Sequence, residues 1–150
     1  MSEVKATAAD AEIVLRLFEL RREAVMREAR NWIAGFMPAS AADVVKVAES
    51  WGTKENAYFR QVISFWEMAA SLLNHGAVHA GLFWDWSGEM LFVYAKFAGF
   101  LPELREKISP EFLGKCEQAI QSSPQAQKGV ERMVGRMKRM AELKAKAEKK

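Results

Sequence analysis

Apolar residues recur at steps of three and four along almost the whole of this 150-residue chain. Strand-like alternation of apolar and polar residues persists nowhere in it. Because steps of three and four place apolar side chains on one helix face, the pattern predicts helices and argues against a sheet. Half of the residues are hydrophobic, and a chain of this length buries a core without disulfides or metals. We therefore expect an all-α fold, a compact bundle of five to six helices.

Glycine, proline and capping residues divide this pattern into helices. The expected helices span about 9–33, 41–51, 54–74 and 88–107, the last with a bend at Gly99–Pro102, and two more begin at Ser109-Pro110 and Ser123-Pro124. A short turn through Leu82–Trp86 precedes the fourth helix. The segment 54–74 is apolar nearly all round, which predicts that it is the central helix.

Positive charge is concentrated at the C-terminal end. Residues 128–150 contain nine Lys or Arg and three Glu and have a net charge of +6, whereas residues 1–127 have a net charge of −3. We predict that residues 1–127 form the bundle domain. Residues 128–150 are expected to continue that domain as a long basic helix whose end is frayed.

The basic segment also carries an apolar seam at helical spacing, formed by Val130, Met133, Met137 and Met140. The steps of three and four residues are typical of a short coiled coil, and methionine adapts to several partners. The seam is our candidate interface, and we favour packing as its role, on the bundle or against a second subunit. A partner helix, an anionic membrane surface and a nucleic acid are the alternatives.

The chain has the features of an intracellular protein. Its single cysteine, Cys116, has no partner for an internal disulfide, which fits a reducing compartment. The first residues include acidic side chains and do not resemble a signal peptide. The longest apolar runs are too short and too often interrupted to span a bilayer. We expect a cytoplasmic protein without a membrane span.

Motifs that indicate catalysis or metal binding are absent from the sequence. His75 and His79 are the only histidines, and Gly76 at an expected helix end separates them. The chain has no Glu-x-x-His pair, no zinc pattern, no Gly-x-Ser-x-Gly and no glycine-rich phosphate loop. We therefore expect no metal, no cofactor and no catalytic residue, and we favour a protein that is not an enzyme.

Polar residues follow one face of the segment 54–74, namely Arg60, Ser64, Glu67, Ser71 and Asn74. One interpretation is a narrow solvent-exposed strip. The other is a buried polar line in which Glu67 pairs with an arginine such as Arg105, because an unpaired buried carboxylate is costly. If the chain binds a small ligand, its candidate pocket is formed by Trp66, Glu67, Asn74, Trp84, Asp85 and Glu89.

The residues around Gly52 imitate a helix-turn-helix motif. Lys54 and Arg60 stand at positions from which they would face phosphate. The second helix, however, is long and mostly apolar, and the acidic body repels DNA. DNA binding is therefore the third of our functional hypotheses.

Four segments occur in an order that resembles a known family: Leu17–Glu23, Asn56–Arg60, Phe65–Gly76, and Gly88-Glu89 with Leu104–Glu106. Together they are similar to a bacterial all-helical family of unknown function, which has an aromatic-aromatic-acid segment followed by a helix-ending glycine. The resemblance covers Asp10 to Ser122. It implies a compact helical bundle and carries no activity or catalytic residues over to this chain.

Our leading functional hypothesis is a non-catalytic helical module that self-associates, as a homodimer, or binds another protein. It rests on the high apolar and aromatic content and on the methionine seam. The alternative from another class is a ligand-binding or enzymatic bundle with a pocket near Glu67 and Asp85. That alternative predicts that the pocket carboxylates converge in one concave site.

Overall fold

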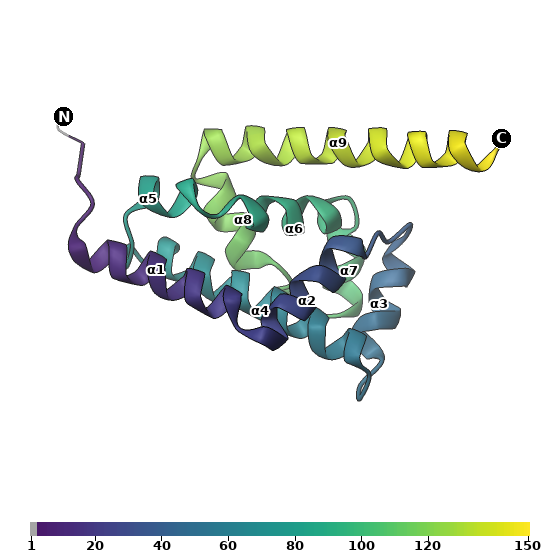
Figure 1. Ribbon diagram of the computed structural model, residues 1–150, viewed down its shortest axis with the longest axis horizontal. Coiled ribbons are helices and arrows are strands. Elements are labelled where there is room, and N and C mark those ends of the chain that lie inside the picture. The colour runs from purple at the N-terminus through teal and green to yellow at the C-terminus, as the bar shows by residue number, and fades with distance from the viewer. Residues whose placement is uncertain (1–2) are drawn as a thin grey trace.

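The computed structural model describes residues 3–150, which fold into helices only. In chain order these are α1 (Ala8–Arg22), α2 (Ala24–Gly35), α3 (Ala41–Glu49), α4 (Lys54–Asn74), α5 (Ala80–Asp85), α6 (Gly88–Ala98), α7 (Leu101–Lys107), α8 (Gly114–Gln121) and α9 (Pro124–Glu148). The all-helical prediction is therefore confirmed. Figure 1 shows α4 and α8 within the body, α1 and α2 along one side of it and α9 along the opposite side.

The long helix α4 is the central element, as its apolar surface predicts. It packs most extensively against α2 and α8, and also against α3. The residues that it buries belong to the core: Asn56, Phe59, Val62, Phe65, Trp66, Ala69 and Ala70. Because these side chains occupy several faces of one helix, neighbouring helices must cover α4 on more than one side.

The expected helix over 9–33 is two helices in the structure, divided at Glu23. Glu23 has an extended backbone (φ −57°, ψ 143°), and its carboxylate accepts the Met26 amide at 2.9 Å as the N-cap of α2. Arg30 donates through Nη1 to the Arg21 carbonyl at 3.2 Å and so binds the end of α1. Neither glycine nor proline marks this break, and side-chain hydrogen bonds hold it instead.

The bend expected at Gly99–Pro102 is present as the junction between α6 and α7. The helix start expected at Ser109-Pro110 is absent, because a turn occupies residues 110–113 and α8 begins at Gly114. Leu113 has a left-handed backbone (φ 55°), and its side chain is fully buried. Phe112 stacks on Phe59 with ring centroids 6.0 Å apart. Burial of these two side chains overrides the local helix-start signal.

Buried polar side chains bind the ends of neighbouring helices. Asn56 donates through Nδ2 to the carbonyls of Val47 and Ala48, at 3.0 and 2.9 Å, at the C-terminal end of α3. Lys96 donates to the carbonyls of Ile33 and Phe36 at the end of α2. These contacts satisfy carbonyls that a helix end leaves without an intrahelical partner. They also fix how α3 and α2 sit on the core.

The last helix joins the body through its first half only. At Gly129 a Cβ atom would lie 2.6 Å from Cδ1 of Leu91, so α9 approaches α6 closely there. The helix continues through Glu148, and every residue from Lys138 onward is exposed. Figure 1 shows the C-terminal end of α9 extending beyond the rest of the molecule. Within residues 3–150, no helix is both long enough and apolar enough to cross a bilayer.

Candidate functional site

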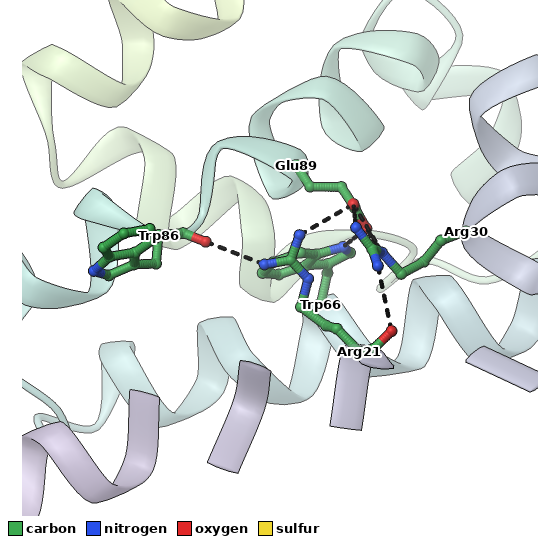
Figure 2. Close-up of polar contacts among 5 residues, drawn as sticks. All are labelled: Arg21, Arg30, Trp66, Trp86 and Glu89. Atoms are coloured by element: carbon green, nitrogen blue, oxygen red, sulfur yellow. Dashed lines mark hydrogen bonds and ion pairs between the residues drawn. The ribbon is translucent and has the colours of Figure 1, made fainter. Parts of the chain in front are cut away.

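A carboxylate at the start of α6 connects three helices of the bundle. Glu89 lies in the first turn of α6, where the helix dipole favours a negative charge. It accepts hydrogen bonds from Arg30 on α2, at 2.7 to 3.0 Å, and from Arg21 on α1, at 3.2 Å. Nε1 of Trp66 on α4 lies 3.4 Å from the same carboxylate. With Trp86, these residues form what we call the Glu89 cluster (Figure 2).

Arg21 is held in this cluster by weaker contacts than Arg30. Its guanidinium lies over the Trp66 ring, 5.2 Å from the ring centroid, and donates through Nη1 to the Trp86 carbonyl at 3.3 Å. Its Nε is buried and has no hydrogen-bond partner among residues 3–150. Charge-assisted hydrogen bonds to a carboxylate are typically about 2.7–2.9 Å long, so Arg30 rather than Arg21 is the main partner of Glu89.

The cluster keeps Glu89 ionised. Burial by itself raises the pKa of this carboxyl, but hydrogen bonds and charge from Arg30 and Arg21 outweigh burial, and the pKa lies below its ordinary value. A carboxylate with a lowered pKa is a poor proton donor near neutral pH. Two arginines around one carboxylate also leave a local excess of positive charge.

An apolar cavity of about 250 Å³ lies beside the Glu89 cluster. Trp66, Phe83 and Leu17 form buried parts of its lining, and Phe18 and Trp86 form exposed parts. Arg21 and Ser87 are the polar residues of the lining. The cavity therefore combines an apolar interior with a cationic side chain on its wall, a common composition for ligand sites.

Two of the six candidate pocket residues lie together here, namely Trp66 and Glu89. Glu67 and Asn74 contact α8 instead: the Glu67 carboxylate accepts the Cys116 amide at 2.8 Å, and Asn74 donates to the Lys115 carbonyl at 3.0 Å. Glu67 thus caps α8, whose own N-cap residue, Leu113, has no side-chain acceptor. The suggested pairing of Glu67 with Arg105 is wrong, because Arg105 pairs with Glu117 at 3.2 Å.

The remaining two candidates belong to α5. Trp84 is half-buried, and its ring meets that of Phe83 edge-on with centroids 5.3 Å apart. Asp85 is exposed at the end of the helix. The structure therefore does not gather the three candidate carboxylates into one concave site, since Glu67 caps α8 and Glu89 binds the two arginines.

The position of the lone cysteine suits packing in the core rather than a reactive thiol. Cys116 is buried in the core. Burial, followed by the nearby charge and hydrogen bond of Glu67, raises the pKa of its thiol well above the ordinary value. Because the thiolate is the reactive form of cysteine, this position suits an inert core side chain.

The four candidate interface residues lie along α9: Val130 packs against the core, and Met137 and Met140 line a second, larger groove. Met133 and Met137 are half-buried and face Ala34, Met37 and Phe92 of the body. Met140 is 59% exposed, and Leu143 beyond it is 64% exposed. An open groove of about 1020 Å³ runs between this half of α9 and the body, with apolar lining from Met37, Pro38, Phe100, Met137, Met140 and Leu143.

The segment that imitates a helix-turn-helix motif folds as α3, a turn at Gly52 and α4. Gly52 has φ 90°, a conformation that favours glycine. Arg60 stacks over the exposed ring of Trp51, 4.7 Å from its centroid, and also donates to Asn56. Because α2, α3 and α8 cover α4, its position differs from that of a recognition helix, which exposes one face to the DNA groove.

Arg21 and Arg30 belong to the cluster, although the sequence pattern does not indicate them as site residues. A single helix over 9–33 would place Arg30 on its solvent-facing side and Phe18 and Val25 on its inward side, whereas Phe18 and Val25 are 45% and 49% exposed in the structure. The break at Glu23 rotates α2 relative to α1 and so changes which residues face the core. The available signal was Glu89 itself, because a partly buried carboxylate needs a cationic partner.

Comparison with known proteins identifies a family for most of the chain. A family model described as Domain of unknown function (DUF4760) matches residues 6–122. These residues include α1 to α8 and end before α9 begins at Pro124. No curated protein and no solved structure matches the chain.

Proposed function

The chain belongs to this family of unknown function, whose description assigns no activity, and we propose that it is a non-catalytic helical module that forms a homodimer through α9. The observation that carries the proposal is the free second half of α9, with its apolar side chains exposed beside an open groove.

The molecule exposes more surface than a compact monomer of its mass. Its accessible surface is 9773 Å², against the roughly 7,700 Å² that the scaling of surface with mass gives for a folded monomer. Figure 1 shows where the chain departs from a compact shape: α9 overhangs the body at one end, and an extended arm precedes α1 at the other. The excess supports a contact that buries the overhanging part of α9.

The overhanging part of α9 has the composition of a contact surface. Met140 and Leu143 continue the apolar face that Met133 and Met137 present to the body. The groove beside them is lined largely by apolar side chains. Methionine and leucine on an exposed helix face fit a second helical surface, because they fill irregular gaps at little cost.

The charge distribution favours a second copy of this chain as the partner of α9. It also restricts how the two copies dock. Residues 128–150 have a net charge of +6, so two such helices lying side by side repel each other. Residues 1–127 have a net charge of −3 and attract the helix of another copy. We therefore expect a reciprocal dimer in which each α9 lies against the body of its partner, around a two-fold axis.

The test measures the molar mass of the full chain and of the variant M140Q/L143Q by light scattering after size exclusion. Glutamine keeps helix propensity and adds no charge, so the substitution removes apolar contact alone. Burying a Met or Leu side chain contributes about 1.5–3 kcal/mol, so we expect the dimer to weaken at least tenfold. Removal of all residues after Gln127 is a poorer test, because it also uncovers the face of α6 on which α9 packs.

The matched control is L20Q, which removes an apolar side chain of similar exposure, 45%, from α1. It should dimerise like the unmodified chain. A full chain that stays monomeric at roughly 100 µM, or a double variant that dimerises as well as the control, overturns the proposal.

A further inference from the structure

The cavity between α1, α4 and α5 has no role in the proposed dimer, because α9 contributes none of its lining residues. We infer that this cavity is a binding site for a small apolar carboxylate, with the hydrocarbon part in the cavity and the carboxylate at Arg21. Three observations carry the inference: the apolar interior, the incompletely paired arginine, and the unused N-terminal end of α6.

The interior of the cavity suits a hydrocarbon rather than water. Val14, Leu17, Trp66 and Phe83 line it, and three of these four side chains are buried core residues. A cavity needs polar partners to hold water, and a dry cavity of about 150 Å³ is known to bind benzene. At about 250 Å³, this cavity has room for a ligand of about ten carbon atoms.

Arg21 supplies the charge that such a ligand needs. Arg30 already holds the Glu89 carboxylate at 2.7 Å, whereas the contacts of Arg21 with Glu89 and with the Trp86 carbonyl are 3.2 and 3.3 Å long. A ligand carboxylate at the cavity wall can therefore take Arg21 as its partner while Arg30 still neutralises Glu89. Arg22, which stacks over the Phe18 ring with Cζ 5.7 Å from its centroid, adds to the positive potential at this edge.

The start of α6 adds hydrogen-bond donors to the same wall. Ser87 lines the cavity and occupies the N-cap position of α6, yet its side chain makes no capping hydrogen bond although the residue is only 4% exposed. The Ser87 hydroxyl is therefore free to donate to a ligand at this wall. Because the N-terminal end of a helix favours anions, a ligand carboxylate is a partner that fits both Ser87 and the helix dipole.

The charged groups around the cavity favour a monocarboxylate as its ligand over a neutral hydrocarbon or a phosphate. Arg21 is the charged side chain of the cavity lining, and beside it Arg30 neutralises Glu89. One arginine without a full partner suits a singly charged group. A phosphate would require more donors than Arg21 and Ser87 supply.

The test uses decanoate and its neutral analogue 1-decanol as probes of the full chain, measured by isothermal titration calorimetry. We expect decanoate to bind one site with a Kd on the order of 0.1 mM, at least tenfold tighter than decanol. Amide chemical-shift changes should centre on residues 14–21 and 83–87. 2-Naphthoate, a rigid aromatic carboxylate, distinguishes a site for flat ligands from a site for flexible chains.

Substitutions distinguish the part of the site that binds the carboxylate from the apolar part that binds the hydrocarbon. R21M should weaken decanoate binding about tenfold and leave decanol unchanged, because methionine retains apolar contact with Trp66 but removes the charge. S87A should weaken decanoate binding less, and V14F should abolish binding of both probes by filling the cavity. R16M, at an exposed arginine of α1 that does not line the cavity, is the matched control and should bind decanoate within about twofold of the unmodified chain.

Each variant is first checked for the helical circular dichroism and melting temperature of the unmodified chain, and R21M and S87A provide the test even if V14F does not fold. The inference fails if decanoate shows no saturable binding below about 1 mM, if decanol binds as tightly, or if R21M retains full affinity for decanoate. None of these outcomes depends on dimerisation through α9, which is measured separately.

Discussion

At the scale of single residues, three side chains act as caps for helices other than their own. Glu67 on α4 accepts an amide at the start of α8, and Asn56 on α4 donates to carbonyls at the end of α3. Lys96 on α6 binds carbonyls at the end of α2. Helix ends leave several backbone groups without partners, and burying those groups unpaired would be costly. These residues therefore specify how helices meet, and for Glu67 the polar stripe on α4 describes only part of its role.

The Glu89 cluster predicts that the free energy of unfolding depends on pH. The pKa of Glu89 lies below its ordinary value of 4.5, so the folded state binds the proton less readily than the unfolded chain. The stabilisation is therefore fully present above pH 4.5 and is lost as the pH falls through the lower folded-state pKa. At pH 7 we expect E89Q to lower the free energy of unfolding by about 2 kcal/mol, since the ion pairs are only partly buried.

Urea unfolding of the unmodified chain and of E89Q, at pH values from neutral to about pH 3, measures the difference in their free energies of unfolding. The gap between the unmodified chain and E89Q should narrow steadily below pH 4.5. E106Q removes an exposed acid from α7 and should show little difference at any pH. A gap that stays constant as the pH falls would show that the charge of Glu89 is not what stabilises the fold.

At the scale of the elements, α9 is a single long helix with two different environments. Its first half lies against α6, with Gly129 at a close approach to Leu91, and its second half is exposed. Gly135 lies further along α9, and a Cβ there would meet nothing nearer than Nη1 of Arg139 at 3.6 Å. The two glycines thus occupy one helix but differ in the space around them.

This difference predicts that two alanine substitutions will change the stability of the fold by different amounts. G135A should raise the free energy of unfolding by about 0.5–1 kcal/mol, because glycine inside a helix is costly relative to alanine. G129A gains the same helix propensity but inserts a methyl group against Leu91, and this overpacking offsets the gain. Thermal unfolding should place G135A above G129A by about 1 kcal/mol. Equal melting temperatures for the two variants would contradict the close packing of α9 on α6.

At the scale of the whole molecule, charge and shape are unevenly distributed. The basic end of the chain forms the helix that extends beyond the body, and the acidic remainder forms the body itself. Screening by salt weakens attraction between exposed charges, because the Debye length falls from about 10 Å at 0.1 M salt to about 3 Å at 1 M.

The proposed reciprocal dimer should therefore loosen as salt is added. We expect the dissociation constant to rise about tenfold between 0.05 M and 0.5 M sodium chloride, measured by sedimentation velocity. Apolar contact alone would give the opposite trend, because excluded salts such as sulfate strengthen burial. A dimer that tightens in salt would show that the basic charge of α9 plays no part in docking.

The sequence by itself determined the local features of this protein. The spacing of apolar residues specified an all-helical chain with α4 at its centre, and Ser40, Thr53 and Ser123 marked helix starts that the structure retains. These signals act within one or two helical turns, so they do not depend on what the helix packs against.

Only the tertiary structure decided which helix ends, charges and apolar faces meet. The capping of α8 by Glu67 and the pairing of Glu89 with Arg21 and Arg30 depend on residues far apart in the chain. The sequence pattern around a residue is the same whether a neighbouring helix buries its side chain or leaves it exposed to water. Its role follows from the partner that the fold brings to it, and the cavity beside Arg21 exists because α1, α4 and α5 meet there.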